Sequence, residues 1–443
     1  MSKSRTSPQR PSGAAWLGDV PSDWGVLSGR RVFEAKREAA REGDEQLSAT
    51  QRYGVVPQRE FMQREDQKVM LALSGVGNFK HVERDDFVIS LRSFEGGIEH
   101  SAFTGCVSPA YTVLRLRNEG EPSYFRYLLK SGPYVAALQS TTDSLRDGKS
   151  INYEQFGAIP LPLPPVTEQI AIASFLDRET GKIDALVEEQ RRLIELLKEK
   201  RQAVISHAVT KGLDPNARMR PSGVEWLGDV PEHWDLVPLK FFAEVGNGST
   251  PNRDNPDYWR DGTYPWLNSS VVNADEVTEA EQFVTERALE ECHLPIVRPP
   301  AILVGITGQG RTRGMATLLS TEATINQHIA FVRPTNSRTD CDYLLGFFEA
   351  AYEPLRTDSE AGSTKGAITC EQLSRLIVPL PPVEEQEAIK AHLTRAVRQV
   401  EALAAAAEAA AQLLLERRAA IISAAVTGQI DVQPANRVRG EAA

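Results

Sequence analysis

The chain of 443 residues is 41% hydrophobic and 25% charged, which is typical of a soluble protein with two to four domains. It has no apolar run long enough to span a bilayer and no apolar N-terminal leader, so we expect neither membrane spans nor secretion. Its four cysteines include no CxxC pair, so we expect no disulfide scaffold and a cytoplasmic location. The net charge of −10 excludes a surface uniformly adapted to nucleic acid but leaves local basic patches possible.

The sequence contains an internal duplication. Residues 11–24 (PSGAAWLGDVPSDW) and 221–234 (PSGVEWLGDVPEHW) are identical at ten of fourteen positions. A second match aligns residues 151–214 with 368–431 without a gap and includes the strings LPPVTEQ and LPPVEEQ. Because the repeat is about 210 residues long, each copy has the size of a domain rather than of a solenoid unit. The copies differ most between these matches, so we expect a shared structural task and different contacts for each copy.

Residues 1–165 are predicted to form a first globular α+β domain. Short β-branched or aromatic segments such as 87–89 and 111–114 indicate strands, and 124–129 indicates a helix. Basic residues in the loops between such elements can approach phosphates or base edges. The candidate DNA-contacting residues in this domain are Arg52, Tyr53, Lys80, Arg146 and Lys149.

Residues 166–214 are predicted to form a long spacer helix. They follow two prolines, and apolar residues recur at the three- and four-residue spacing of a heptad seam. The predicted packing residues of this seam are Ile183, Leu186, Leu193, Leu197 and Val204.

Residues 215–382 are predicted to form a second globular α+β domain. The loop 307–314 follows an expected strand at 301–304, and its glycines allow a close approach of the backbone to a ligand. A second basic glycine loop, 362–366, lies where 144–149 lies in the first domain. Each loop could equally be a solvated turn, but its recurrence at equivalent places favours a contact role. The candidate residues are Arg311, Arg313, Ser363, Thr364 and Lys365.

Residues 383–431 are predicted to form a second long helix, and 432–443 a disordered tail. A helix of this length cannot bury its seam alone. We therefore predict that the two helices pair as an antiparallel coiled coil about a pseudo-twofold axis, with the two domains at opposite ends. The alternative is two separate helices, each packed on its own domain. The seam residues of the second helix are Val400, Leu403, Ala407, Ala410, Leu414 and Ile421.

No motif of a catalytic centre is found. The sequence lacks GxxxxGK[ST], GxSxG and HExxH, and its seven histidines are isolated. The segment 255–258 is close to the Asn-Pro-Pro-Tyr box of amino-methyltransferases, but Asp257 replaces the second proline and no glycine-rich cofactor loop accompanies it. We expect no catalytic residue, no metal and no cofactor on this chain.

The duplicated motifs resemble those of the specificity subunits of type I restriction–modification enzymes. The resemblance rests on the doubled SGxxWLGxxPxxW motif, the doubled LPP-x-x-EQ start of a long helix and the AVTxG-like helix end. In the second domain it also includes 248–251, 258–266 and 324–327, whereas 105–111 of the first domain is similar to the other common target-domain type of this family. The similarity covers nearly the whole chain.

The resemblance implies a function for each part. The two α+β domains would be target recognition domains, each binding one half of a split double-stranded DNA site, and the helices would be a spacer that fixes the gap. The subunit would have no activity of its own. It would assemble with two modification (methyltransferase) subunits that bind S-adenosylmethionine and methylate adenine, and with two restriction subunits that use ATP and Mg to translocate and cut DNA.

Two other functions are compatible with the residues alone. One is a coiled-coil scaffold whose domains bind proteins, which failure to bind DNA in any complex would support. The other is a self-contained DNA methyltransferase or nuclease with unrecognised motifs, which cofactor binding by the isolated chain would support. The absence of a cofactor loop favours the DNA-specificity subunit.

Overall fold

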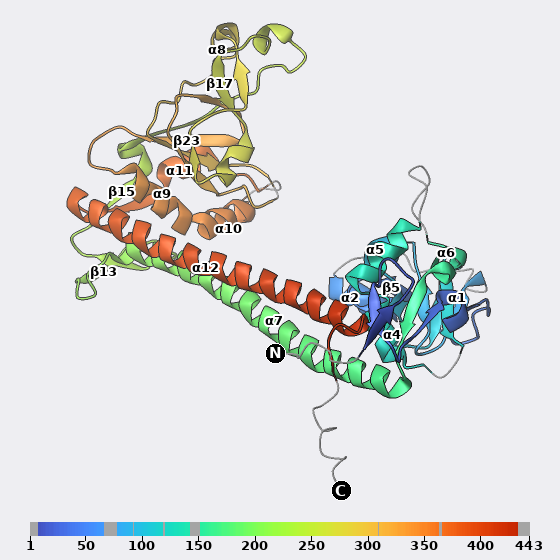
Figure 1. Cartoon of the computed structure of the whole chain (residues 1–443). Coiled ribbons are helices and arrows are strands. Elements are labelled where there is room, and N and C mark those ends of the chain that lie inside the picture. The colour runs from blue at the N-terminus through green and yellow to red at the C-terminus, as the bar shows by residue number, and fades with distance from the viewer. Residues whose placement is uncertain are drawn as a thin grey trace. The chain divides into compact units, whose positions relative to one another are not determined.

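The computed structural model describes residues 8–65, 78–91, 93–117, 120–141, 151–308, 310–362 and 366–432. The chain forms two compact units, unit 1 (Met1–Arg191 with Ala409–Ala443) and unit 2 (Arg192–Glu408). Each unit holds one globular domain and part of each long helix, α7 (Val166–Lys211) and α12 (Val383–Val426) (Figure 1). The two helices begin where the sequence predicted and end three and five residues earlier. All of the predicted tail except Val432 lies outside the described residues.

The globular domain of unit 1 is built from short strands and helices. Its main sheet has the order β4-β11-β8-β9, and β11 is antiparallel to both β4 and β8. The carboxyl ends of β4 and β8 and the amino end of β11 therefore meet at one edge. The elements are β1 (Gln9–Pro11), β2 (Asp19–Pro21), β3 (Gly25–Ser28), α1 (Gly29–Val32), β4 (Phe33–Lys36), β5 (Leu47–Thr50), β6 (Gly54–Pro57), α2 (Gln58–Glu65), β7 (Lys80–Val82), β8 (Phe87–Ile89), α3 (Ser93–Gly96), β9 (Glu99–His100), β10 (Gly105–Val107), β11 (Thr112–Leu116), α4 (Pro122–Leu128), α5 (Gly132–Ser140), α6 (Tyr153–Ala158) and β12 (Pro160–Leu163).

Unit 2 repeats this arrangement with larger sheets. Its main sheet has the order β16-β23-β20-β21-β18, and β23 is antiparallel to β16 and β20, so the same three-strand edge recurs. The elements are β13 (Met219–Pro221), β14 (Asp229–Pro231), β15 (Asp235–Pro238), η2 (Leu239–Phe241), β16 (Ala243–Asn247), η3 (Pro256–Tyr258), β17 (Tyr264–Leu267), η4 (Ser269–Asn273), β18 (Glu276–Val277), β19 (Gln282–Val284), α8 (Glu286–Glu291), β20 (Ala301–Gly305), β21 (Ala316–Leu319), β22 (Thr324–Ile325), β23 (Ile329–Pro334), α9 (Cys341–Ala350), α10 (Tyr352–Gly362), α11 (Cys370–Arg375) and β24 (Ile377–Leu380).

The repeated tryptophan motif (residues 11–24 and 221–234) anchors the end of a long helix in each unit. In unit 2, Trp234 is 1% exposed and belongs to one apolar core with the last turns of α7. In unit 1, Trp24 is equally buried against the last turns of α12. Tyrosine hydroxyls fasten the same helix ends to the domains, through Tyr124 with Pro162 and Val426 in unit 1 and Tyr343 with Pro379 and Val209 in unit 2.

A buried glutamine explains the repeated EQ at the start of each long helix. In unit 2, Gln386 is fully buried, and its side-chain Nε2 donates to the carbonyl oxygens of Pro381 and Arg338, both at 2.8 Å. Its Oε1 accepts the backbone N–H of Asp340 at 2.9 Å. Gln169 makes two equivalent contacts in unit 1, in which its Nε2 donates to the Pro164 carbonyl at 2.8 Å and its Oε1 accepts the Glu121 backbone N–H at 2.9 Å. The glutamine thus joins the helix start to the chain that precedes α9 or α4.

Replacing Gln386 with Ala is expected to lower the free energy of unfolding of unit 2 by about 1–3 kcal/mol, because three buried backbone groups lose their partner. Calorimetric unfolding of the full chain measures the effect. The matched control is Gln412→Ala, because Gln412 is exposed and contacts only Glu416, at 3.2 Å, with its Nε2. Equal stability of the two variants would contradict the anchoring role of Gln386.

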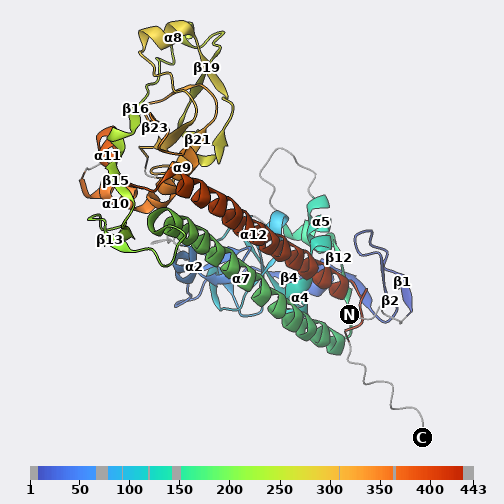
Figure 2. The same cartoon turned by 90° about the vertical axis from the view of Figure 1, so that its left-hand side faces the viewer.

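Helices α7 and α12 run antiparallel in both units. In unit 1, Asp184 forms an ion pair with Arg418 at 2.8 Å, and the earlier Ile172 shares a core with the later Ala425. In unit 2, Arg201 lies 3.4 Å from Glu401, and the later Ala208 and Val209 share a core with the earlier Ile389 and Leu393. Figures 1 and 2 both show the two helices side by side within each unit. The helices also pack on their domains, so each of the two predicted packing modes is present in part.

The buried seam of the long helices differs in phase from the predicted one. Leu186, Leu193 and Leu403 are 44%, 42% and 56% exposed, so their assignment to the seam is wrong. The predicted positions Ile183, Leu197 and Val400 are buried at 5–6%, whereas Val204, Leu414 and Ile421 are half-buried. Val187, at 4% exposure, is buried in place of Leu186. The next buried position after Ile183 is therefore four residues along the helix, whereas the sequence prediction placed it three residues along. None of the described helices is long and apolar enough to cross a membrane.

Candidate nucleic-acid interface

Three loops of unit 2 emerge from one edge of its main sheet. The loop 248–251 follows β16, the loop 306–314 follows β20, and the turn 326–328 precedes β23. These strands are antiparallel neighbours, so the three segments meet at the same edge. The sequence prediction had placed candidate residues on only one of these loops, 307–314.

The side chains of these loops form a hydrogen-bonded cluster, which we call the polar edge cluster (Thr250, Thr307, Asn326, Gln327 and His328). Thr250 Oγ1 donates to Gln327 Oε1 at 2.6 Å, and Gln327 Nε2 lies 3.2 Å from His328 Nε2. Thr307 Oγ1 lies 2.7 Å from His328 Nδ1, and the His328 backbone N–H donates to Asn326 Oδ1 at 2.9 Å. Gln327 and His328 are exposed, and a glutamine amide can make a bidentate contact with adenine. The cluster therefore presents donors and acceptors on a fixed frame.

Gly248 is required for this frame by a close backbone approach. A Cβ at this position would lie 1.7 Å from the carbonyl oxygen of Ile325, so no other residue fits without moving the chain. The contact brings the 248–251 loop against the turn that carries Gln327. This geometry accounts for the Gly-Ser-Thr-Pro string, which the sequence showed only as part of a resemblance.

An exposed arginine is held by two tryptophans beside the polar edge cluster. The Arg253 guanidinium carbon lies 3.9 Å from the centroid of the Trp259 ring and 4.6 Å from that of Trp266. Arg253 Nη1 donates to Gln282 Oε1 at 2.9 Å, and Trp266 Nε1 donates to the Ser249 carbonyl at 3.2 Å. A stacked arginine loses less rotamer freedom when it meets a phosphate. Arg253 was not among the predicted contact residues, although both tryptophans lie in strings that carried the resemblance.

Arg313 has a structural role, and its predicted contact with DNA is wrong. The residue is only 4% exposed, and its guanidinium donates to the Gly366 carbonyl and pairs with Glu360. These contacts tie the 307–314 loop to the end of α10 and the segment that follows. A guanidinium in this position cannot reach a ligand outside the domain.

Arg311 is exposed, and side chains of α10 donate hydrogen bonds to the backbone of its loop. The Tyr352 hydroxyl donates to the Arg311 carbonyl at 2.9 Å, and Arg356 Nη1 donates to the Gly310 carbonyl at 2.8 Å. Arg311 also lines a hollow of about 1280 Å³ in unit 2. Four arginines and five carboxylates line it, so the hollow is not a selective cleft for a polyanion: Arg201, Arg311, Arg356, Arg398, Asp275, Glu276, Glu349, Glu353 and Glu401. Contact of Arg311 with DNA stays a prediction.

In unit 1, Arg52 and Tyr53 lie together at the surface. The Arg52 guanidinium carbon is 5.1 Å from the Tyr53 ring centroid, and that of Arg64, on α2, is 5.0 Å from it. The Tyr53 hydroxyl donates to Glu65 at 2.8 Å, which raises the pKa of Tyr53. The Arg52 side chain is 70% exposed, so this aromatic and basic pair can contact a phosphate and a base or sugar.

Lys80 is half-buried in unit 1. Its Nζ donates to the carbonyl oxygen of Tyr111, and burial lowers its pKa. Its ammonium group supports the chain just before β11, and a contact of Lys80 with DNA stays a prediction. The remaining candidates, Arg146, Lys149, Ser363, Thr364 and Lys365, lie outside the described residues.

The chain therefore contains two copies of one α+β arrangement, and each copy carries different loops at the same sheet edge and packs on parts of both long helices. A family model described as the type I restriction modification DNA specificity domain matches residues 231–409. The chain is 23% identical over 401 residues to the putative MjaX specificity subunit of Methanocaldococcus jannaschii, covering 85% of this chain and 87% of that protein. It is 25% identical over 353 residues to the EcoKI specificity subunit of Escherichia coli, covering 74% and 69%.

Solved structures show the same fold. One chain from a type I restriction–modification system matches with a TM-score of 0.70 at 18% identity, covering 93% of this chain and 99% of that chain. The HsdS subunit of Thermoanaerobacter tengcongensis matches with a TM-score of 0.55 at 18% identity, covering 93% and 98%. Residues 231–409 thus match the DNA specificity domain of type I restriction–modification systems, and the chain shares the fold of these solved chains.

Proposed function

We propose that each unit binds one half of a split double-stranded DNA site through the loops at its three-strand sheet edge. The observation that carries this proposal is the recurrence of one frame with different loops. In unit 2 the edge presents the polar edge cluster, whereas in unit 1 it presents the segments that follow β4 and β8 and precede β11. The turn with Arg52 and Tyr53 adjoins the segment after β8, where Gln51 Nε2 donates to Glu95 Oε2 at 3.3 Å. A common frame with different side chains suits two readers of different base sequences.

The proposed partners are those that the resemblance to type I specificity subunits implies. Two modification subunits would bind S-adenosylmethionine and methylate adenine within the bound site. Two restriction subunits would use ATP and Mg to move and cut DNA, and the complex would act in the cytoplasm. The antiparallel helix pair would set the distance between the two half-sites, which we expect to be close to one helical turn of DNA.

Selection from random DNA tests this proposal. The chain, co-purified with its modification subunit, is incubated with a random-sequence duplex pool, and the bound molecules are sequenced. We expect a motif of two short blocks separated by a fixed number of unspecified base pairs. Recovery of a single contiguous block, or of no motif with an assembled complex, would contradict the assignment of one half-site to each unit.

Single replacements identify the residues that contact DNA. Gln327→Ala is expected to relax one block at one or two positions, with a loss of about 1–3 kcal/mol in discrimination, because a bidentate amide contact is removed. Arg311→Ala is expected to weaken binding to the selected site. The control is Arg338→Ala, since Arg338 is 74% exposed and pairs with Asp235 at 3.1 Å, away from the three loops.

A further inference from the structure

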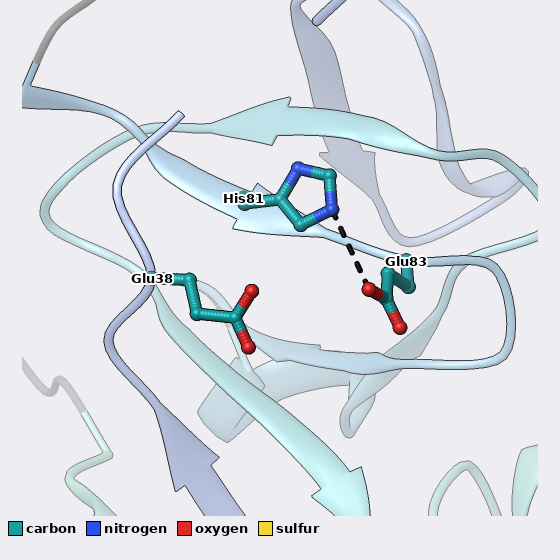
Figure 3. Close-up of side chains that lie close together, drawn as sticks. All are labelled: Glu38, His81 and Glu83. Atoms are coloured by element: carbon teal, nitrogen blue, oxygen red, sulfur yellow. Dashed lines mark ion pairs between the residues drawn. The ribbon is translucent and has the colours of Figure 1, made fainter. Parts of the chain in front are cut away.

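Unit 1 contains a compact group of potential metal ligands, one of which lies in the segment that follows β4. Glu38 follows β4, His81 lies in β7 and Glu83 follows β7, and the His81 backbone N–H donates to the Glu38 carbonyl at 2.9 Å. One ligand atom from each side chain lies within 4.8 Å of those of the other two. Figure 3 shows both carboxylates on the same side of the His81 ring.

The His81 ring is oriented as in metal-binding histidines. It is 2% exposed, and its Nδ1 lies 2.8 Å from Oδ2 of Asp44, whose side chain is 8% exposed. A backbone N–H, that of Arg41, donates to the same Asp44 oxygen at 2.7 Å and fixes the carboxylate. Histidines that bind metals usually donate their second ring N–H to a carboxylate, which sets the tautomer and directs the other lone pair. In the tautomer that donates Nδ1–H to Asp44, Nε2 carries the lone pair that faces the glutamates.

The Nε2 atom of His81 is buried and has no hydrogen-bond partner. The Oε1 atom of Glu83 is 3.8 Å away, which is beyond the range of a hydrogen bond. Buried polar atoms in native proteins nearly always have a hydrogen-bond partner or a ligand, so we expect His81 Nε2 to have one as well. A cation between Nε2 and the two carboxylates would supply it.

The charge balance near His81 also favours the binding of a cation. The ligand group belongs to a network of four carboxylates and two guanidinium groups, whose formal charges leave two excess negative charges. The contacts are Arg41 with Glu38 at 2.9 Å and Glu83 at 3.2 Å, and Arg115 with Asp86 at 2.7 Å, Glu83 at 3.1 Å and Glu38 at 3.6 Å, with Asp44 on the far side of the ring. Arg41 is 56% exposed and can turn into solvent when an ion takes its place.

We propose that Glu38, His81 and Glu83 bind a divalent transition-metal ion such as Zn²⁺ or Mn²⁺. One imidazole with two carboxylates suits these ions better than Ca²⁺ or Mg²⁺. Bonds of about 2.0–2.2 Å place tetrahedral ligands roughly 3.4 Å apart, so the glutamates need only a small movement. Their side chains are 38% and 40% exposed, which allows this movement and the entry of the ion. The bound ion would link the segment after β4 to β7.

Calorimetric titration of Zn²⁺ into the metal-free full-length chain tests this site. We expect saturation at one equivalent. Glu83→Gln is expected to lower the affinity at least tenfold, and Asp44→Asn by roughly 10- to 100-fold, because Asp44 orients the histidine without touching the ion. Two controls should bind like the wild type: Glu34→Gln, whose carboxylate pairs with Lys36, and His100→Gln, whose ring pairs with Asp85 at 3.0 Å.

Thermal unfolding separates a binding defect from misfolding. Without metal, Glu83→Gln should unfold cooperatively, and Zn²⁺ at a hundredfold excess over its Kd should raise the Tm of unit 1 by about 5–10 °C in the wild type only. The proposal is overturned if the wild type shows no saturable equivalent, or if Glu83→Gln and Glu34→Gln bind equally. The first of these results would assign His81 to an ion pair of an imidazolium with Asp44 and Glu83.

Discussion

Arg313→Ala is expected to lower the free energy of unfolding of unit 2 by about 2–4 kcal/mol. The replacement leaves the Gly366 carbonyl without its donor and opens a space beneath the 307–314 loop. The partner Glu360 is 63% exposed, so its carboxylate can be solvated, which keeps the loss below that of a fully buried ion pair. Calorimetry of the full chain measures the shift in the unit 2 transition.

Two comparison variants separate the structural role of Arg313 from a DNA contact. Arg311→Ala should change stability by less than about 0.5 kcal/mol, because Arg311 is an exposed side chain of the same loop. Gly366→Ala should destabilise as Arg313→Ala does, since Gly366 has a φ of +56° and an added Cβ would lie 2.0 Å from Arg313 Nη1. If Arg313→Ala left stability unchanged but abolished DNA binding, the buried role would be wrong.

Val187→Asp is expected to destabilise unit 1 by about 3–4 kcal/mol. Val187 is 4% exposed in the seam of α7, and the replacement removes apolar burial and puts a carboxylate in its place. The neighbouring Leu186 is 44% exposed, so Leu186→Asp should cost less than about 1 kcal/mol. Urea unfolding of both variants, followed by circular dichroism, measures the difference.

This pair of variants tests the phase of the helix seam directly. The sequence prediction put Leu186 in the seam, and the structure puts Val187 there. If Leu186→Asp were the more damaging of the two, the antiparallel pairing of α7 and α12 described above would be in the wrong register.

The positions of the long helices were predictable from the sequence, but the phase of their seam was not. The Pro-Pro pairs, the absence of interior prolines and the ungapped repeat place the starts of α7 and α12. Leu186, Leu193 and Leu196 fit one heptad phase as well as Val187 and Leu197 fit another, because α7 carries apolar residues on neighbouring faces. Partner geometry decides between the phases, and a single helix sequence does not contain it.

The contact residues were harder to predict than the fold. A basic residue beside a glycine looks the same in sequence whether its guanidinium is exposed, as in Arg311, or buried, as in Arg313. Thr250 and His328 were missed because they are 78 residues apart and become neighbours only through the β16-β23-β20 order. The useful signal was the set of short strings shared with the family, which mark the loops at this edge.

Genome-wide mapping of N6-methyladenine tests the central claim most directly. Cells would express the modification subunit with the wild-type chain, with Gln327→Ala, with Arg52→Ala or without this chain. With the wild-type chain we expect methylation at a split motif with a fixed gap, and without the chain we expect this methylation to disappear. Gln327→Ala should alter recognition of one half of the motif only. Arg52→Ala should alter recognition of the other half only. A motif that persists without the chain, or the same half altered by both variants, would contradict two units that each read one half-site.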